Sequence, residues 1–282
     1  MTEKDYFENK EKIIALKDKK ITDLKREVLE LKEKLYESEH LKTKFLSIIS
    51  NELKNPVSAV SAISRSAVDK KSISLEKLEE IFLTIEKETK RFSLQLDNIL
   101  SASSIEAGEN SFYVSFFDAG EVMENVFDFY SDEIKEKGLE YKKDIDTNSF
   151  LYGDREKIKL LFKNFIDNCI KFSDKQISIE LKSFSKSLKA SFFNDGREIE
   201  FSSQKRLFER FNPLSSELSR NYSGIGLGLC VCASIVEMHK GEISFCSGEN
   251  NGTLFEIELP LDNKDDISKQ REKDFDESFI IL

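Results

Sequence analysis

Residues 45–57 read Phe45-Leu46-Ser47-Ile48-Ile49-Ser50-Asn51-Glu52-Leu53-Lys54-Asn55-Pro56-Val57. Apolar residues recur in this stretch at the spacing of one helix face, and a polar cluster occupies the turn before the proline. Pro56 lacks a backbone N–H and its ring clashes with the preceding turn, so we expect a kink just after the cluster. The stretch is therefore predicted to be the second half of a long helix.

The preceding segment, residues 1–43, is predicted to form a coiled coil. It is rich in Lys and Glu and contains neither Pro nor Gly. Apolar residues occupy heptad positions, with five in one row and two in the matching row: Phe7, Ile14, Ile21, Val28 and Leu35, then Leu24 and Leu31. Polar residues interrupt the second row, so we expect a coil that is weak alone. A single solvated helix is the alternative interpretation.

The following segment completes a helical hairpin over residues 44–108. Ser74 is a predicted N-cap of the second helix, with Glu76 in its first turn. Apolar residues again repeat every seven positions, at Leu78, Ile85, Phe92 and Ile99. A hairpin is too thin to hide such a face, whereas two hairpins form a four-helix bundle. The sequence therefore predicts a homodimer.

From residue 109 the pattern changes to mixed α and β, and it continues to residue 261. We expect strands near residues 112–116, 140–145, 177–181, 188–193, 242–246 and 253–259, and helices capped by Asp118 and Asp154. Helices on one face of a mixed sheet make a two-layer sandwich, so the predicted fold class is α+β, a helical N-terminal part followed by an α/β sandwich. Residues 262–282 form an acidic tail that we expect to be disordered.

The composition narrows the function classes. The net charge is -10, which argues against non-specific binding of nucleic acid. No run approaches the roughly 20 apolar residues of a membrane span, and the N-terminus does not resemble a signal peptide, so we expect a cytoplasmic protein. The four cysteines are expected to be reduced. Cys230 and Cys232 are interpreted as small buried residues rather than as a pair of metal ligands.

Residues 45–57 resemble the phospho-acceptor box of sensor histidine kinases, Phe-Leu-x-x-Ile-Ser-His-Glu-Leu-Arg-Thr-Pro-Leu. Asn51 stands where the family has its acceptor histidine. The resemblance covers roughly residues 41–261 and implies a dimerisation bundle followed by the family's ATP-binding (Bergerat) domain. It also implies a response regulator receiver domain as partner, and a homodimer or, alternatively, a heterodimer with an intact histidine kinase.

The resemblance to the ATP-binding domain rests on ordered motifs. They are residues 164–172, residues 194–199, the Leu207–Phe211 box, the glycine motif of residues 223–229, and Gly252 with Thr253. It implies ATP and Mg²⁺ as cofactors, with Mg²⁺ on Asn168. The other residues that it places at the nucleotide are Asn164, Lys171, Phe172, Asn194, Gly196, Gly224, Gly226, Gly228 and Thr253.

Two departures from the family pattern affect the adenine end of this site. Asn194 replaces the usual aspartate and Glu198 replaces a glycine. An asparagine oxygen can still accept a hydrogen bond from adenine, but without charge assistance. We therefore expect ATP binding that is weaker than is usual in the family. A shifted register, in which Asp195 serves instead, would misplace Gly196.

Asn51 changes the expected chemistry. The lone pair of a carboxamide nitrogen is delocalised into the carbonyl, so we expect no autophosphorylation at this degenerate acceptor position. Glu52 and Asn55 match the motif with which the family dephosphorylates response regulators, Asn55 orienting the water. Three functions stay open: action on a regulator or on a partner histidine in trans, an inert scaffold that binds ATP or a regulator, and an autokinase that uses His40.

Overall fold

The computed structural model describes residues 53–65, 74–108, 111–200, 204, 206–208, 226–248 and 252–261, with single residues and short runs between 17 and 50. The chain divides into two compact units, Met1–Asn51 and Glu52–Leu282. In the first unit the described residues are helical, and Leu24, Val28 and Leu31 of the predicted seam are exposed in the single chain. The other seam residues, Phe7, Ile14, Ile21 and Leu35, lie outside the described residues, so the coiled coil stays a prediction.

Two helical segments open the second unit. Residues 53–65 are helical, and Pro56 lies within this helix. Helix α2 (Leu75–Glu106) begins at Ser74, whose side chain accepts the backbone N–H of Lys77, so the predicted cap is confirmed. Among the described helices, none is both long and apolar enough to cross a membrane.

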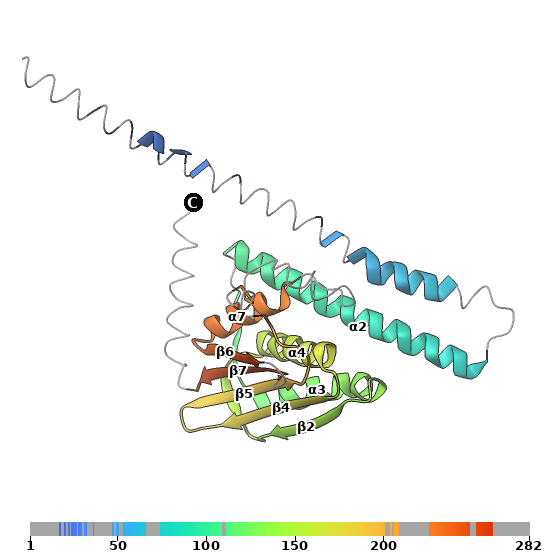
Figure 1. Cartoon of the computed structure of the whole chain (residues 1–282). Coiled ribbons are helices and arrows are strands. Elements are labelled where there is room, and N and C mark those ends of the chain that lie inside the picture. The colour runs from blue at the N-terminus through green and yellow to red at the C-terminus, as the bar shows by residue number, and fades with distance from the viewer. Residues whose placement is uncertain are drawn as a thin grey trace, which may run out of the picture. The chain divides into compact units, whose positions relative to one another are not determined.

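The rest of the unit is built on a five-stranded mixed sheet of order β2-β4-β5-β7-β6 (Figure 1). Only the β2–β4 pair among these is parallel. Its strands are β2 (Glu140–Ile145), β4 (Gln176–Ser183), β5 (Ser187–Asn194), β6 (Glu242–Gly248) and β7 (Gly252–Pro260). A separate antiparallel pair joins β1 (Val114–Asp118) to β3 (Phe150–Asp154). Strand β3 was not predicted, and β1 begins two residues later than expected.

Three helices cover one face of the sheet: α3 (Ala119–Glu136), α4 (Arg155–Phe172) and α7 (Gly228–Met238). Asp118 and Asp154 are the N-caps of α3 and α4, and the Asp154 side chain accepts two backbone N–H groups at 3.1 Å. Between the layers Phe165 of α4 stacks on Phe192 of β5, with ring centroids 4.9 Å apart. The predicted two-layer α/β sandwich and the α+β fold class are confirmed.

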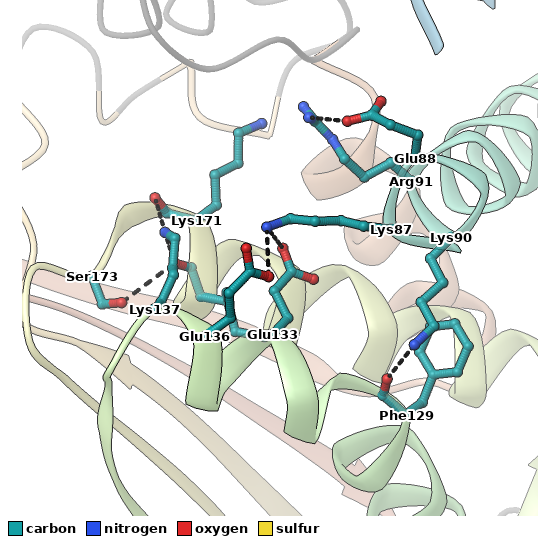
Figure 2. A network of polar contacts seen from close by, with 11 residues as sticks. Lys87, Glu88, Lys90, Arg91, Phe129, Glu133, Glu136, Lys137, Lys171 and Ser173 are labelled. Carbon is teal, nitrogen blue, oxygen red and sulfur yellow. Dashed lines mark hydrogen bonds and ion pairs between the residues drawn. The ribbon is translucent and has the colours of Figure 1, made fainter. Parts of the chain in front are cut away.

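Helix α2 contacts this sandwich through α4 and α7, and through salt bridges to α3. Figure 2 shows the part that faces α3, where Lys87 reaches Glu133 and Glu136, and Lys90 reaches the carbonyl of Phe129. On other sides of α2, Phe82 and Leu100 are exposed. The helix thus carries one face that the sandwich covers and an apolar face that the single chain leaves open.

Candidate functional site

The end of β5 places two neighbouring polar side chains in different surroundings. Asn194 is 4% exposed, and its Oδ1 accepts the backbone N–H of Gly196 at 3.2 Å. The Asp195 carboxylate instead accepts the backbone N–H groups of Asp174 and Lys175, which belong to the turn between α4 and β4. Asp195 is therefore committed to this turn, and Asn194 is the side chain at the end of the strand that faces the interior.

The pKa of the Asp195 carboxyl follows from the same contacts. Burial acts to raise this pKa, but the backbone N–H groups of residues 174–176 outweigh burial and leave it lowered. The carboxylate form is thus the one that the turn stabilises.

Two glycines bring backbone close to Asn194. A Cβ at Gly196 would lie 1.8 Å from the carbonyl oxygen of Phe172, and a Cβ at Gly252 would lie 2.1 Å from that of Asn194. Gly252 also has a φ of +69°, which side chains rarely adopt. The end of β5 is therefore clamped between the end of α4 and the start of β7, in a form that only glycines permit.

Thr253 lies beside Asn194 and completes this corner. The two residues are register partners on β7 and β5, and Thr253 is 3% exposed. The Thr253 hydroxyl is 2.8 Å from the hydroxyl of Ser247, which also accepts the backbone N–H of Ile199. Ser247 was missed by the sequence reasoning. Its position opposite Thr253 in the β6–β7 hairpin was the available signal, because residues in register share a neighbourhood.

Helix α4 carries three polar residues that the sequence assigned to the nucleotide, Asn164, Asn168 and Lys171. They differ in burial and in their partners. The Asn164 amide is buried and bonded to Asn98 of α2 and to the carbonyl of Leu160, so it is not directed at solvent. Asn168 is half-buried one turn later. The Lys171 ammonium lies 5.4 Å from the centre of the Phe172 ring, and Phe172 is half open to solvent. Asn168 and Lys171 thus form the accessible part of the set.

Carboxamide oxygen at Asn168 suits Mg²⁺, a hard cation that prefers oxygen ligands. Among the described residues, no group of three His, Cys, Asp or Glu side chains could hold a metal ion without a nucleotide. Asn168 would therefore hold Mg²⁺ only together with a bound nucleotide, because one amide oxygen is too few for a site made by the protein alone.

Charged residues between α2, α3 and α4 were not predicted. Partial burial raises the pKa of the Asp167 carboxyl, and the positive charges of Lys171, Arg91 and Lys137 oppose this shift. Burial lowers the pKa of the Lys137 ammonium, which donates to the carbonyls of Ile170 and Lys171 at the end of α4 (Figure 2). Lys137 thus satisfies carbonyls that α4 leaves open at its C-terminus, next to the predicted phosphate lysine.

The glycine motif is described from Gly226 onward. Gly226 has a φ of +71°, and α7 begins at Gly228 after Leu227, which provides no side-chain cap. The first N–H groups of a helix lack intrahelical partners and carry positive potential, so this turn suits phosphate. Gly224 lies outside the described residues, as do Asn51, Glu52 and His40. Asn55 is described and exposed, and it is not brought to the other site residues by any observed contact.

His239 is a structural residue. Its Nε2 accepts the backbone N–H of Asp154 at 3.1 Å, and its Nδ1 lies 2.7 Å from the carbonyl of Ile235. These contacts fix the tautomer with the proton on Nδ1. Burial lowers the pKa of this imidazole.

Two protein families match successive parts of the chain. Residues 153–263 match the family described as histidine kinase-, DNA gyrase B- and HSP90-like ATPase. Residues 41–108 match the His Kinase A (phospho-acceptor) domain.

The relatives are longer signalling proteins. The chain is 32% identical over 225 residues to hybrid signal transduction histidine kinase B of Dictyostelium discoideum, covering 77% of this chain and 11% of that protein. It is 26% identical over 241 residues to the signal transduction histidine-protein kinase BarA of Escherichia coli K12, covering 82% and 26%. The chain thus spans about a quarter or less of these two relatives.

A solved structure shows the same fold. The Acinetobacter baumannii histidine kinase AdeS is similar with a TM-score of 0.53 and 21% identity, over 75% of this chain and 98% of that one.

Proposed function

We propose, because the chain belongs to the sensor histidine kinase family, that it binds ATP with Mg²⁺ at the corner formed by α4, the end of β5 and the start of α7. The observation that carries this proposal is the buried Asn194–Thr253 pair, clamped by Gly196 and Gly252. A polar pair that is buried at the end of a strand and held by two close backbone approaches is a specific binding corner rather than ordinary core.

Asn194 has the capacity to hold the adenine end. Its Oδ1 has two lone pairs, and the Gly196 N–H takes one of them. The second lone pair can accept the exocyclic amino group of adenine, while the amide N–H₂ group can donate to a ring nitrogen. Thr253 adds a hydroxyl on the same side.

At the other end, Lys171 and the first turn of α7 would meet the phosphates, and Asn168 would hold Mg²⁺. When bound, the ion would supply positive charge that offsets the negative charge of the phosphates. The chain's own residues orient the nucleotide: the Lys171 ammonium acts as a point charge, and the backbone N–H groups of α7 act as fixed dipoles. Gly226 and Gly228 let that backbone approach.

We further propose that the chain does not phosphorylate itself at Asn51, since a carboxamide nitrogen is no nucleophile at neutral pH. It acts instead on a response regulator, with Asn55 orienting water on a phospho-aspartate and Glu52 beside it. The exposure of Lys54 and Asn55 on the helix of residues 53–65 supports this proposal. Phosphorylation of a partner histidine in trans, in a homodimer or a heterodimer, uses the same nucleotide site.

An inert scaffold is the second candidate function. Asn194 and Glu198 favour it, because both changes weaken the adenine end of the site relative to the family pattern. An autokinase that uses His40 is the third.

Incubation with γ-labelled ATP, alone and with purified receiver domains, tests the proposal. We expect no label on the chain itself, and faster loss of phosphate from a cognate phosphorylated receiver. Label on the chain that disappears with His40→Ala would establish the third function instead. Docking of a receiver with no change in its phosphate would establish the scaffold.

A further inference from the structure

A buried pair of amides joins α2 to the sandwich. Asn98 Nδ2 donates to Asn164 Oδ1, and Asn164 Nδ2 donates to Asn98 Oδ1, both at 2.8 Å. Both residues are less than a tenth exposed, and Asn164 Nδ2 also donates to the Leu160 carbonyl at 2.9 Å. Asn164 therefore uses its whole N–H₂ group and is held in one orientation.

The first residue of α7 rests on this pair. A Cβ at Gly228 would lie 2.6 Å from Asn164 Oδ1 and 3.9 Å from Asn98 Nδ2. This glycine is needed here for the close approach of α7 to the pair, since its φ is not positive. A movement of the Asn164 amide would therefore displace Gly228 and the turn that begins α7.

Two ion pairs between α2 and the sandwich are more exposed than this amide pair. Lys87 pairs with Glu136 at 3.1 Å, and Asp97 pairs with Lys163 at 3.8 Å (Figure 2 shows the former). Exposed ion pairs contribute little to stability because water and salt screen them. The amide pair differs, because breaking it leaves Asn164 Oδ1 buried without its donor. Loss of the Asn98–Asn164 contact should therefore disturb the packing of α2 on the sandwich more than loss of either ion pair.

We infer that Asn98 is a positioning residue for the nucleotide site, acting through Asn164 on the first turn of α7. This inference rests on the proposed function, since that turn is the proposed phosphate site. When α2 is seated, Asn98 fixes Asn164 and Asn164 supports Gly228, so the N–H groups of α7 are held ready for phosphate. Nucleotide binding and the seating of α2 therefore favour one another, and thermodynamic linkage makes the effect reciprocal.

Calorimetric titration of the full chain with MgADP tests the first half of this coupling. We expect Asn98→Ala to weaken MgADP binding about fivefold or more, the lower end of typical coupling between sites. Asp97→Ala is the matched control, because it removes an exposed α2–α4 ion pair one residue away. We expect this control to bind MgADP like the wild type.

Asn98→Asp provides a second test, in which the same variant is compared with itself at different pH values. At neutral pH its carboxylate can accept from Asn164 Nδ2 but cannot donate to Asn164 Oδ1, so MgADP binding is weakened. Protonation on acidification restores an O–H donor, and binding then recovers relative to the wild type in the same buffers. Asn98→Ala has no such group and shows no recovery.

Hydrogen exchange measures the reciprocal effect, which is that of nucleotide binding on the packing of α2. We expect MgADP to slow exchange over residues 87–102 in the wild type, and we expect this slowing to be lost in Asn98→Ala. Wild-type affinity in Asn98→Ala, or a flat pH profile for Asn98→Asp, overturns the positioning role and leaves the proposed function standing. Absence of MgADP binding in the wild type and in every variant overturns both.

Discussion

Both carboxylate oxygens of Asp195 accept the backbone N–H of Lys175, at 3.0 and 3.1 Å. This contact commits Asp195 to the turn after α4 and leaves its neighbour Asn194 as the residue available to the proposed nucleotide site. The two adjacent residues thus have separate roles, one in the turn after α4 and one in the proposed site.

Asp195→Ala should lower the free energy of unfolding while changing MgADP affinity little. The variant leaves the N–H groups of Asp174 and Lys175 without their acceptor, a loss of about 1 kcal/mol. Because the folded chain lowers the pKa of Asp195, its contribution is present above the unfolded value of about 3.9 and is lost as the pH falls through the lowered folded pKa. Urea unfolding of the wild type and the variant measures the loss of unfolding free energy and its dependence on pH. The assay runs from about pH 3 to about pH 7, a range that reaches below the unfolded pKa of about 3.9. A tenfold loss of MgADP affinity would show that Asp195, and not Asn194, serves the adenine.

Asn194→Asp should strengthen MgADP binding by about tenfold, because a charged acceptor makes a stronger hydrogen bond than a neutral one. Calorimetry on the full chain measures the change. Glu198→Gly, added in the same protein, removes a negative charge and a Cβ near the end of β5. Absence of binding in the wild type and in the double variant alike would contradict the nucleotide site itself.

His239 should make the chain less stable in mild acid. Burial lowers the pKa of this imidazole in the folded chain, whereas in the unfolded chain it titrates near 6.5, its ordinary value. The unfolded state therefore binds the proton first, so the free energy of unfolding falls as the pH drops below about 6.5 and stops falling below the folded pKa. Above that window the contribution is constant.

Thermal unfolding of the wild type and of His239→Gln measures the pH dependence that His239 contributes. The assay runs from about pH 8 to about pH 5, which brackets the unfolded pKa of about 6.5. The chain's other histidine, His40, is present in both proteins, so the difference between the two curves isolates His239. Identical pH dependence in the two proteins would contradict the buried neutral imidazole.

Helices and strands whose ends are marked by nearby residues could be predicted from the sequence. Asp154 was predicted to cap a helix, and it is the N-cap of α4 (Arg155–Phe172). Strand β2 (Glu140–Ile145) has the predicted bounds. Strand β3 was missed because its partner β1 lies more than thirty residues earlier, and pairing across that distance leaves no local signal.

Some contacts of the proposed site residues follow the order of the sequence motifs, and others do not. Asn194, Gly196 and Thr253 do meet at one corner, as the motif order suggested. Asn164 was assigned to the nucleotide, yet the observed partner of its amide is Asn98, sixty-six residues away. A helical spacing places residues on one face, but which neighbour covers that face depends on packing that the spacing does not encode.

The exposed apolar side chains of α2 should be covered by a second copy of the chain. Phe82 and Leu100 are 66% and 60% exposed on this helix, and exposed apolar surface of this kind favours association. We expect a dimer at micromolar concentration, which is typical of helical bundles that share their core. Leu100→Glu should shift the chain toward monomer, while Lys77→Glu, at an exposed polar position, should not. Sedimentation velocity distinguishes the two, and a monomeric wild type would contradict the bundle.

The last prediction concerns Asn55. It is exposed next to Lys54 on the helix of residues 53–65. Replacing it should therefore change the stability of the chain little. If its amide orients water on a phospho-aspartate, Asn55→Ala should abolish acceleration of phosphate loss from a cognate receiver and leave receiver docking unchanged. The matched control is Ser58→Ala, an exposed polar residue on the same helix that carries no proposed chemistry. Phosphate loss is followed on a phosphorylated receiver, and docking is followed separately by calorimetry. Because the reaction needs no histidine nucleophile, Asn51→His should leave this activity in place, whereas an autokinase would gain label on the chain. A receiver that docks and loses phosphate at the same rate with the wild type, with Asn55→Ala and with no added protein would exclude the phosphatase and leave the scaffold function.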